Sequence, residues 1–450
     1  MSRCYPYFFA AAAVSASLSL ACSTASAETI TYGPLLSRGA TPDSMIVRWG
    51  TSATGDATSL RFRQKGDALY TMAMGRPARD HEVVLTGLKL GTQYEYVVQS
   101  GTAMSATYTF ATCPAPGMPL DVVFYGDSRD GATAHARVLS EVQKRAPDMV
   151  FESGDLTPSG KYEQYLTEFF PTAKGLFATI PLMAVPGNHD AGSPYAQNYG
   201  AIFPSPKSGP PGQPWTSYYT FQCGNSQFIG LDSNDVQDAD QNKFLDDSLR
   251  TASQSKDIQH VFIWFHHSAY SPGSHGDANN VIANWVPIFR DPKNKVTAVF
   301  GGHDHVYARM RDSSDVIYVV SGGAGAPLYS DTKASRATKV VSKSAYNFVS
   351  LHIAGLMMSA VAYDDTGTEI DRFSITKPTI DPPPPPDMGA DRPDAGIDTN
   401  DPLPMMGEGG CSLLAQGGRS AQATTGGLFA LGLLGLLILR SLLPRRRRMQ

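Results

Sequence analysis

Oxygen and imidazole side chains follow five apolar runs in the middle of the chain, at the point where each run ends. The runs read VVFYGD, MVFESGD, LMAVPGNHD, FIWFHH and AVFGGHDH, and they end in Asp127, in Asp155, in Asn188, His189 and Asp190, in His266 and His267, and in His303 and His305. One acidic or amide residue after a strand is usually a turn or a helix cap. In open α/β sheets, however, ligands bind where the carboxyl ends of strands meet. Five such ends in one region therefore predict one shared site.

The spacing of His303 and His305 indicates what this site holds. Residues i and i+2 of an extended chain point to the same side, so both rings should face one point just beyond the strand. A histidine satisfied within the core would explain one ring, but it explains a pair poorly in a chain with only ten histidines. The pair therefore favours a metal centre.

The full donor set narrows the kind of metal site. The candidate ligands are two aspartates, one asparagine and three histidines: Asp127, Asp155, Asn188, His266, His303 and His305. Mixed oxygen and nitrogen ligation suits zinc, iron or manganese. Six donors are too many for one tetrahedral ion, and they fit two ions about 3.5–4 Å apart that share a carboxylate. Such a pair holds phosphate oxygens and activates water, so we expect metal-assisted hydrolysis of phosphoesters.

The elements that position these residues alternate between strands and helices. In residues 119–377, helical stretches at 134–146 and 161–177 lie between apolar strands, which indicates an α/β architecture. The stretches 347–355, 357–365 and 370–375 predict closing antiparallel strands. Residues 28–116 contain short alternating runs typical of a β-sandwich, with Trp49 as a core residue and Tyr94 as a tyrosine corner.

The two ends carry sorting patterns. Residues 1–27 have a cationic start, an apolar stretch and small residues at the end, which predicts a secretory signal peptide. Residues 381–410, rich in Pro, Asp and Gly, cannot bury enough apolar surface to fold and predict a stalk. Residues 411–450 contain an apolar helix at 426–439 and an arginine cluster at 445–448, which predicts a membrane anchor. We expect an exported protein at the cell surface, anchored by this tail or released after processing near Cys411.

Composition limits the partners. At 450 residues two or three domains are expected. The net charge of −4 and the hydrophobic content of 42% indicate an ordinary globular protein, with no sign of a nucleic-acid partner and no indication of oligomeric state. Of five cysteines, only Cys113 and Cys223 lie outside the two ends. In an oxidising compartment they could pair and join the domain junction to the catalytic body. Two buried free thiols are an equal alternative.

The motifs GDSRD, GDLTPSG, GNHD, HHSAY and GHDH, in this order and spacing, resemble those of the calcineurin-like metallophosphoesterases. The β-sandwich in front and the stretch YYTFQCGNSQFIGLDS make residues 30–375 similar to the purple acid phosphatase branch. This resemblance implies a fibronectin type III-like sandwich followed by a four-layer α/β sandwich. It also implies acid phosphatase-like hydrolysis of phosphomonoesters by a hydroxide that bridges two metal ions. The tail from residue 411 resembles myxobacterial-type C-terminal sorting segments, with a plain single-pass anchor as the alternative.

The resemblance assigns a role to each motif residue. The six donors divide between two ions: Asp127 and His305 for the first, Asn188, His266 and His303 for the second, and Asp155 shared by both. His189 would contact phosphate and assist the leaving group, held by Asp190. His267 would lie beside the site, and His275, in a loop rich in Gly and Ser, either contacts substrate or is a solvated loop residue.

Three positions depart from the family pattern, of which one, Ser268 in place of a proline after the fourth-motif histidines, is expected to have no effect. Pro158 stands where purple members have a metal-binding tyrosine three residues after the bridging aspartate, so an iron(III)–tyrosinate pair is not expected. Arg129 stands where many relatives have His or Gly. It could reach a phosphate as a bidentate donor, but a salt bridge to a loop acid is slightly favoured.

Three functions remain open at this point: hydrolysis of phosphomonoesters, hydrolysis of phosphodiesters or nucleotides, and non-catalytic binding at the cell surface. A phosphodiesterase or nucleotidase would share the same metal centre, because substrate choice depends on the surrounding loops. A surface binding protein with a decayed enzyme domain would normally have lost metal ligands first, and all six candidates are present. We therefore expect an enzyme that acts on a small phosphoester.

Overall fold

The computed structural model describes residues 28–378, except 53–56, 174, 192–195, 210–216 and 315. The predicted signal peptide, the stalk and the C-terminal segment lie outside these residues. Within the described part of the chain, no helix is both long and apolar enough to cross a membrane.

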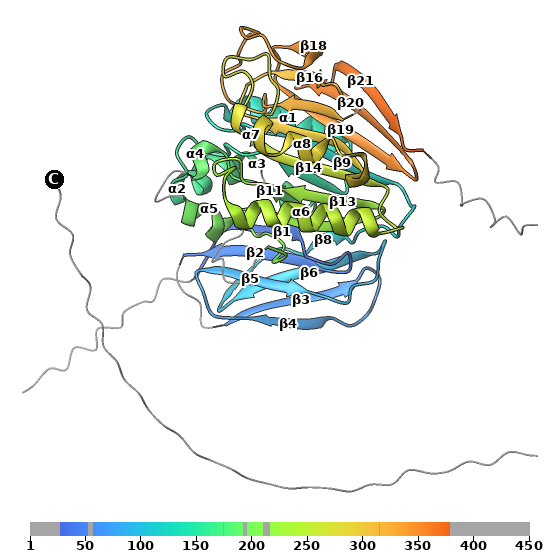
Figure 1. Cartoon of the computed structure of the whole chain (residues 1–450). Coiled ribbons are helices and arrows are strands. Elements are labelled where there is room, and N and C mark those ends of the chain that lie inside the picture. The colour runs from blue at the N-terminus through green and yellow to red at the C-terminus, as the bar shows by residue number, and fades with distance from the viewer. Residues whose placement is uncertain are drawn as a thin grey trace, which may run out of the picture. The chain divides into compact units, whose positions relative to one another are not determined.

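The N-terminal strands form two packed sheets (Figure 1). One contains β1 (Ile30–Arg38), β2 (Met45–Thr51) and β5 (Asp80–Leu85), and the other contains β4 (Thr71–Gly75), β3 (Thr58–Gln64), β6 (Gln93–Ser100), β7 (Ala103–Met104) and β8 (Tyr108–Ala111). Trp49 is fully buried between them. The Tyr94 hydroxyl accepts a hydrogen bond from the Lys89 amide, at 2.9 Å. The predicted sandwich and its tyrosine corner are thus confirmed.

The region that follows contains two larger mixed sheets. The first has the order β11 (Leu182–Ala184), β10 (Met149–Glu152), β9 (Leu120–Tyr125), β19 (Asn347–Ala354), β20 (Met357–Asp364) and β21 (Glu369–Thr376). The second has the order β12 (Tyr219–Cys223), β13 (Ser226–Gly230), β14 (His260–His267), β15 (Val296–Gly302), β17 (Ile317–Ser321), β16 (Tyr307–Arg311) and β18 (Thr338–Lys343). The three predicted closing strands are β19, β20 and β21, which pair antiparallel with one another.

The two sheets face each other across an apolar core, in which Phe124 of β9 stacks on Phe151 of β10 and on Phe300 of β15. Helical segments cover the outer face of the first sheet: α1 (Ala132–Lys144), α2 (Tyr162–Gln164), η1 (Tyr165–Phe169), α3 (Phe170–Ala173), η2 (Leu176–Ala178) and α5 (Ala196–Ile202). The outer face of the second sheet is covered by α6 (Ala239–Gln254), α7 (Asn279–Asn284) and α8 (Val286–Phe289), followed by η3 (Pro292–Asn294). The order helix, sheet, sheet, helix is the expected four-layer α/β sandwich.

Residues 161–177 differ from the single helix that the sequence predicts. Tyr165–Phe169 form a turn of π-helix, and Gly175 adopts a left-handed conformation (φ 76°) that ends the segment before η2. The wider π-turn keeps Tyr165 and Phe169 both buried against the first sheet. Turns of this kind occur frequently at functional sites.

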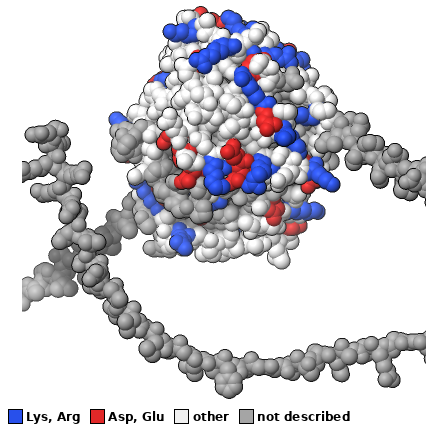
Figure 2. Space-filling view, viewed as in Figure 1, with Lys and Arg blue, Asp and Glu red and all other residues white. Residues whose placement is uncertain are grey.

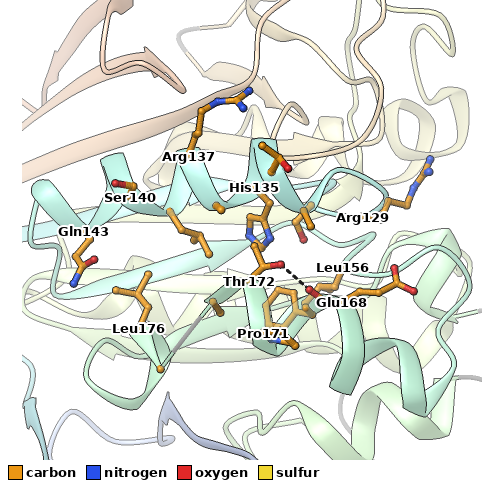
Figure 3. A pocket seen from close by; sticks show the side chains of 18 of the residues that line it. Arg129, His135, Arg137, Ser140, Gln143, Leu156, Glu168, Pro171, Thr172 and Leu176 are labelled. Atoms are coloured by element: carbon orange, nitrogen blue, oxygen red, sulfur yellow. Dashed lines mark hydrogen bonds between the residues drawn. The ribbon is translucent and has the colours of Figure 1, made fainter.

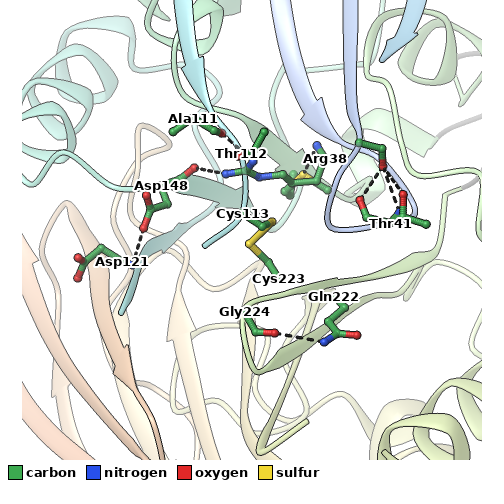
Figure 4. Close-up of a disulfide and its surroundings, with 12 residues drawn as sticks. Arg38, Thr41, Ala111, Thr112, Cys113, Asp121, Asp148, Gln222, Cys223 and Gly224 are labelled. Carbon is green, nitrogen blue, oxygen red and sulfur yellow. Dashed lines mark hydrogen bonds between the residues drawn. A yellow bond between two sulfur atoms is a disulfide. The ribbon is translucent and has the colours of Figure 1, made fainter. Parts of the chain in front are cut away.

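Covalent and polar contacts join the sandwich to the catalytic region (Figure 4). Cys113, which follows β8, forms a disulfide with Cys223 at the end of β12. The two cysteines are therefore paired, and the alternative of two free thiols is wrong. Beside it, the buried Arg38 donates to the carbonyls of Ala111 and Asp148, at 2.8 and 2.9 Å, and burial lowers its pKa to about 10. The sandwich is therefore fixed against the catalytic region.

The surface above α6 mixes charges of both signs. On the face shown in Figure 2, acidic and basic side chains alternate. On α6 itself, Lys243 and Arg250 both pair with Asp247. Pairs of this kind between exposed side chains contribute little to stability.

Candidate dinuclear metal centre

The candidate ligands meet where strands from both sheets end. Three of them, Asp127, Asp155 and His303, have left-handed backbone conformations, with φ of 60°, 60° and 70°. These conformations are uncommon outside glycine and concentrate at functional sites. Each one turns the chain sharply after its strand, so that the side chain points back over the strand ends.

Glycines in the motifs let the loops approach one another. A Cβ on Gly187 would lie 2.1 Å from Asp155 Oδ1, and one on Gly302 would lie 2.2 Å from Asp127 Oδ2. Real contacts of this kind are never so short, so only glycine fits at either position. This explains why the third and fifth motifs carry glycine close to a ligand.

Three candidate ligands converge on the ring of a fourth, His266. Its Nε2 lies 3.0 Å from Asn188 Oδ1, 3.1 Å from His303 Nδ1 and 3.4 Å from Asp155 Oδ1. Its Nδ1 lies 3.0 Å from the carbonyl of Ser153, which fixes the ring with Nε2 towards the site. This group comprises the expected ligands of the second ion together with the shared carboxylate.

The other two donors face each other nearby. His305 Nε2 lies 3.5 Å from Asp127 Oδ1, and its Nδ1 lies 2.7 Å from the carbonyl of Pro327. Asp127 is fully buried, and its Oδ1 has no hydrogen-bond partner among the described residues. A buried carboxylate oxygen without a donor costs free energy that a cation would remove. The residues present therefore fit a metal ion at this point.

Burial favours the neutral form of two imidazoles of this site, those of His266 and His303, whereas at His305 burial is outweighed by the neighbouring Asp127, which raises its pKa. Burial, followed by the neighbouring His266, lowers the pKa of His303 to about 2. Burial and then His267 lower the pKa of His266 well below its usual value. Burial raises the pKa of Asp127 to about 6. Neutral imidazoles are the form that binds metals, and a bound cation would favour the ionised Asp127.

His189 lies on α4 (Asn188–Ala191) and points towards the shared carboxylate. Its amide donates to Asp155 Oδ1 at 2.9 Å, and its ring Nε2 lies 3.7 Å from Asp155 Oδ2. The expected support by Asp190 is wrong, because the ring Nδ1 lies 2.6 Å from the carbonyl of Pro158 instead. The residue that replaces the family's tyrosine thus orients this histidine with its backbone.

Asp190 has a different task. It is fully buried, and its Oδ2 accepts hydrogen bonds from the amides of Asp155 and Gly187, at 2.7 and 3.0 Å. Its Oδ1 accepts from the Tyr165 hydroxyl at 2.9 Å. Asp190 therefore holds the loops of the second and third motifs together and positions Asp155, rather than acting on substrate.

The predicted substrate-binding residues surround the centre. Arg129 Nε donates to Asp155 Oδ2 at 3.3 Å. Its guanidinium also pairs with Asp130, the acidic residue that follows it in the same loop. His267 lies closer than expected, because it forms with His266 and His303 a group that could hold a metal. Its Nδ1 lies 2.8 Å from the Ser233 hydroxyl.

The ring of His275 lies against that of His303, with the two ring centres 4.0 Å apart. Its Nδ1 lies 3.1 Å from Asp304 Oδ1. Sequence reasoning did not single out Asp304, although it stands between the two histidines of GHDH. It also missed Tyr329, whose ring stacks on His305 with centres 4.1 Å apart. No pattern around Tyr329 could have revealed this contact.

Family comparisons agree with this geometry. The calcineurin-like phosphoesterase family model matches residues 120–307, and the model of the purple acid phosphatase N-terminal domain matches residues 32–112. The chain carries a purple acid phosphatase N-terminal domain, followed in sequence by a calcineurin-like phosphoesterase domain. The phosphoesterase domain supplies all the candidate ligands.

Solved structures show the same fold. A purple acid phosphatase from seeds of yellow lupin (Lupinus luteus) superimposes with a TM-score of 0.69 at 17% identity, over 76% of this chain and 74% of that one. PhoD superimposes with a TM-score of 0.56 at 14% identity, over 78% and 92%.

Two curated relatives come from Arabidopsis thaliana. Probable inactive purple acid phosphatase 24 is 24% identical over 386 residues, which covers 72% of this chain and 62% of that protein. Purple acid phosphatase 13 is 26% identical over 302 residues, which covers 55% and 54%. The chain thus spans less than two thirds of either relative.

Proposed function

We propose that this chain is a dinuclear-metal phosphatase that hydrolyses phosphomonoesters. The observation that carries the proposal is the convergence of all six candidate ligands in one cluster, in which the buried Asp127 Oδ1 has no hydrogen-bond donor among the residues that the structure describes. A site that had lost its chemistry would have no reason to retain this arrangement together with the oriented His189.

Each residue then has a task in the reaction. Two ions, when bound, would supply charge neutralisation for phosphate and lower the pKa of a coordinated water. Asp155 lies between the two ligand groups, and Asp190 holds it there through its amide. The Nδ1–H of His189 donates a hydrogen bond to the carbonyl of Pro158, so its Nε2 faces the site. Once protonated, Nε2 gives its proton to the departing alcohol oxygen.

The metals are taken to be zinc, manganese or iron. Pro158 leaves the first ion without the family's tyrosinate, which removes the ligand best suited to stabilise iron(III). We expect the metal-loaded protein to lack the colour that such a bond produces.

Export to the cell surface belongs to the same proposal. The disulfide between Cys113 and Cys223 supports it, since disulfides persist mainly in oxidising compartments. The signal-like start and the apolar, arginine-rich end of the sequence support it as well.

Two other functions compete with this one. Phosphodiesters or nucleotides would use the same ligands, because only the surrounding loops distinguish them. Two relatives, probable inactive purple acid phosphatases 24 and 27, bear names of inactive phosphatases, and a non-catalytic surface protein is the corresponding function here.

The decisive experiment compares substrates on reloaded protein. The chain is stripped, reloaded in turn with zinc, manganese and iron, and assayed with an aryl phosphomonoester and the matching diester. We expect faster turnover of the monoester, and loss of activity by a factor of about 100 or more in Asp155→Asn. Preference for the diester would favour the second function. Absence of turnover with metal bound would favour the non-catalytic one.

A further inference from the structure

A long groove runs along the outer side of the first sheet, between α1 and the segment η1–α3–η2 (Figure 3). Its volume is about 960 Å³, at the upper end of the range for ligand pockets. In Figure 3, Arg129 and Glu168 lie at one end of it, and Gln143 and Leu176 lie at the other. We refer to it as the α1–α3 groove.

Small side chains on α1 keep the groove open. Ala132, Ala136 and Ser140 recur every four residues, so they lie on one face of the helix, and all three line the groove. Larger residues at these positions would fill the space between α1 and α3. The small residues of α1 therefore keep the groove open.

The floor of the groove is apolar. It is formed by buried side chains of the outer core, among them Leu139, Leu156, Phe169 and Leu176. The one buried imidazole of the lining, His135, is neutral at physiological pH because burial lowers its pKa to about 3. Hydroxyl and amide groups of Ser140, Thr172 and Gln143 lie along the rim.

The groove begins where the metal centre ends. Ser128, Arg129 and Asp130, which follow the ligand Asp127, line its end, and so does Leu156, which follows Asp155. Arg129 links the two directly, because its Nε donates to Asp155 Oδ2 while its side chain borders the groove. A molecule whose phosphate lay on the centre could therefore extend past Arg129 into the groove.

The charges at this end select the occupant. Asp130 and Glu168 line it together with Arg129, whose charge is offset by Asp130 and Asp155, so Glu168 is left to repel an anionic group. Arg137, the other basic residue of the lining, pairs with Asp365. The apolar floor offers no compensating charge for such a group either. An uncharged, elongated and mostly apolar chain matches the lining best.

We propose that the α1–α3 groove is the leaving-group subsite, which gives the enzyme a preference for phosphomonoesters of long aliphatic alcohols. This inference rests on the proposed phosphatase function for the position of the phosphate. The groove itself is built from residues outside the metal centre.

The test uses ethyl, hexyl and decyl phosphonate, which cannot be hydrolysed, with binding to the metal-loaded full chain measured by calorimetry. We expect affinity to increase with chain length, by up to about fourfold for each methylene that becomes buried. Ala136→Phe should fill the groove, lower the affinity for decyl phosphonate at least tenfold and leave that for ethyl phosphonate unchanged. Lys243→Phe, on the exposed side of α6 and outside the groove, serves as the control and should behave like the unaltered protein.

The outcomes separate the two proposals. Equal affinity for all three phosphonates, or the same dependence on chain length in Ala136→Phe, would overturn the groove as subsite while leaving the phosphatase proposal intact. Failure of ethyl phosphonate to bind would count against the phosphatase. Decanol, which has no phosphorus, then tests the groove alone. Its binding to the unaltered protein but not to Ala136→Phe supports the groove, and its failure to bind overturns it.

Discussion

His303 and His305 are two residues apart in sequence, yet the structure gives them different neighbours. His303 Nδ1 faces His266, whereas His305 Nε2 faces Asp127. The left-handed backbone at His303 breaks the extended geometry, so the two rings do not simply point to one spot. They thus contact different members of the ligand set, as two separate ions would require.

This difference predicts separable metal losses. His305→Ala should release the ion held with Asp127, and His303→Ala the ion held with Asn188 and His266. Each variant should retain one ion per chain, because Asp155 remains. Metal content after gel filtration measures this, with His352→Ala, an exposed histidine paired with Asp121, as control. Retention of both ions in either variant would refute the division.

His135 predicts a contribution to stability that depends on pH. Burial holds its pKa near 3 in the folded chain, against 6.5 for an ordinary histidine. Between these values the unfolded chain binds a proton that the folded chain does not, so stability falls as pH drops from about 6.5 towards 3. The slope is at most about 1.4 kcal/mol per pH unit.

His135→Phe, which keeps a ring in the same space, should flatten the dependence in this window and leave stability above pH 7 nearly unchanged. Urea unfolding of the metal-free protein across the pH range gives the comparison, since metal release would add its own pH dependence. An unaltered slope in the variant would show that His135 protonates freely in the folded state.

At the scale of elements, the loop 271–276 is folded around one buried carboxylate. Asp304 Oδ1 accepts from the amide and Nδ1 of His275, at 2.9 and 3.1 Å. Its Oδ2 accepts from the Ser271 hydroxyl and from the amide of Gly276. This places the His275 ring beside the second group of ligands.

Asp304 should therefore act on substrate binding through His275. Asp304→Asn removes a charge-assisted contact worth about 1.5–3 kcal/mol, so we expect KM to rise about tenfold or more with kcat less affected. His275→Ala should raise KM similarly. The double variant should be no worse than His275→Ala alone, because the two residues act as one unit. Additive effects, with metal content unchanged, would mean that Asp304 works by another route.

The same elements show what sequence could and could not provide. The sheets were predictable because their strands are apolar, and the ligands were predictable because they follow those strands. The π-turn at Tyr165, the Pro158 carbonyl behind His189 and the stacking of Tyr329 on His305 were not. Each depends on where two distant loops meet, and backbone contacts between loops leave no residue pattern.

At the scale of the whole molecule, a disulfide joins the sandwich to the catalytic region and keeps them linked in the unfolded chain. The disulfide links positions 110 residues apart and restrains the unfolded chain strongly. We expect replacement of Cys113 and Cys223 by serine to lower the free energy of unfolding by about 2–5 kcal/mol.

Urea unfolding of the metal-free protein measures the loss. The reduced unaltered chain is the control and should lose about as much. A loss far below this range would show that Arg38 and its neighbouring contacts hold the junction without the disulfide.

The candidate centre takes ligands from both sheets. Asp127, Asp155 and Asn188 follow strands of the first sheet, His266 lies on β14 of the second, and His303 and His305 follow β15 of the second. An ion bound there would fasten the two halves of the sandwich at one edge. Metal binding would then raise the free energy of unfolding, by an amount that grows with the logarithm of the free metal concentration. Scarcity of metal would thus loosen the architecture as well as the chemistry, and resistance to heat would report how much metal the surroundings supply.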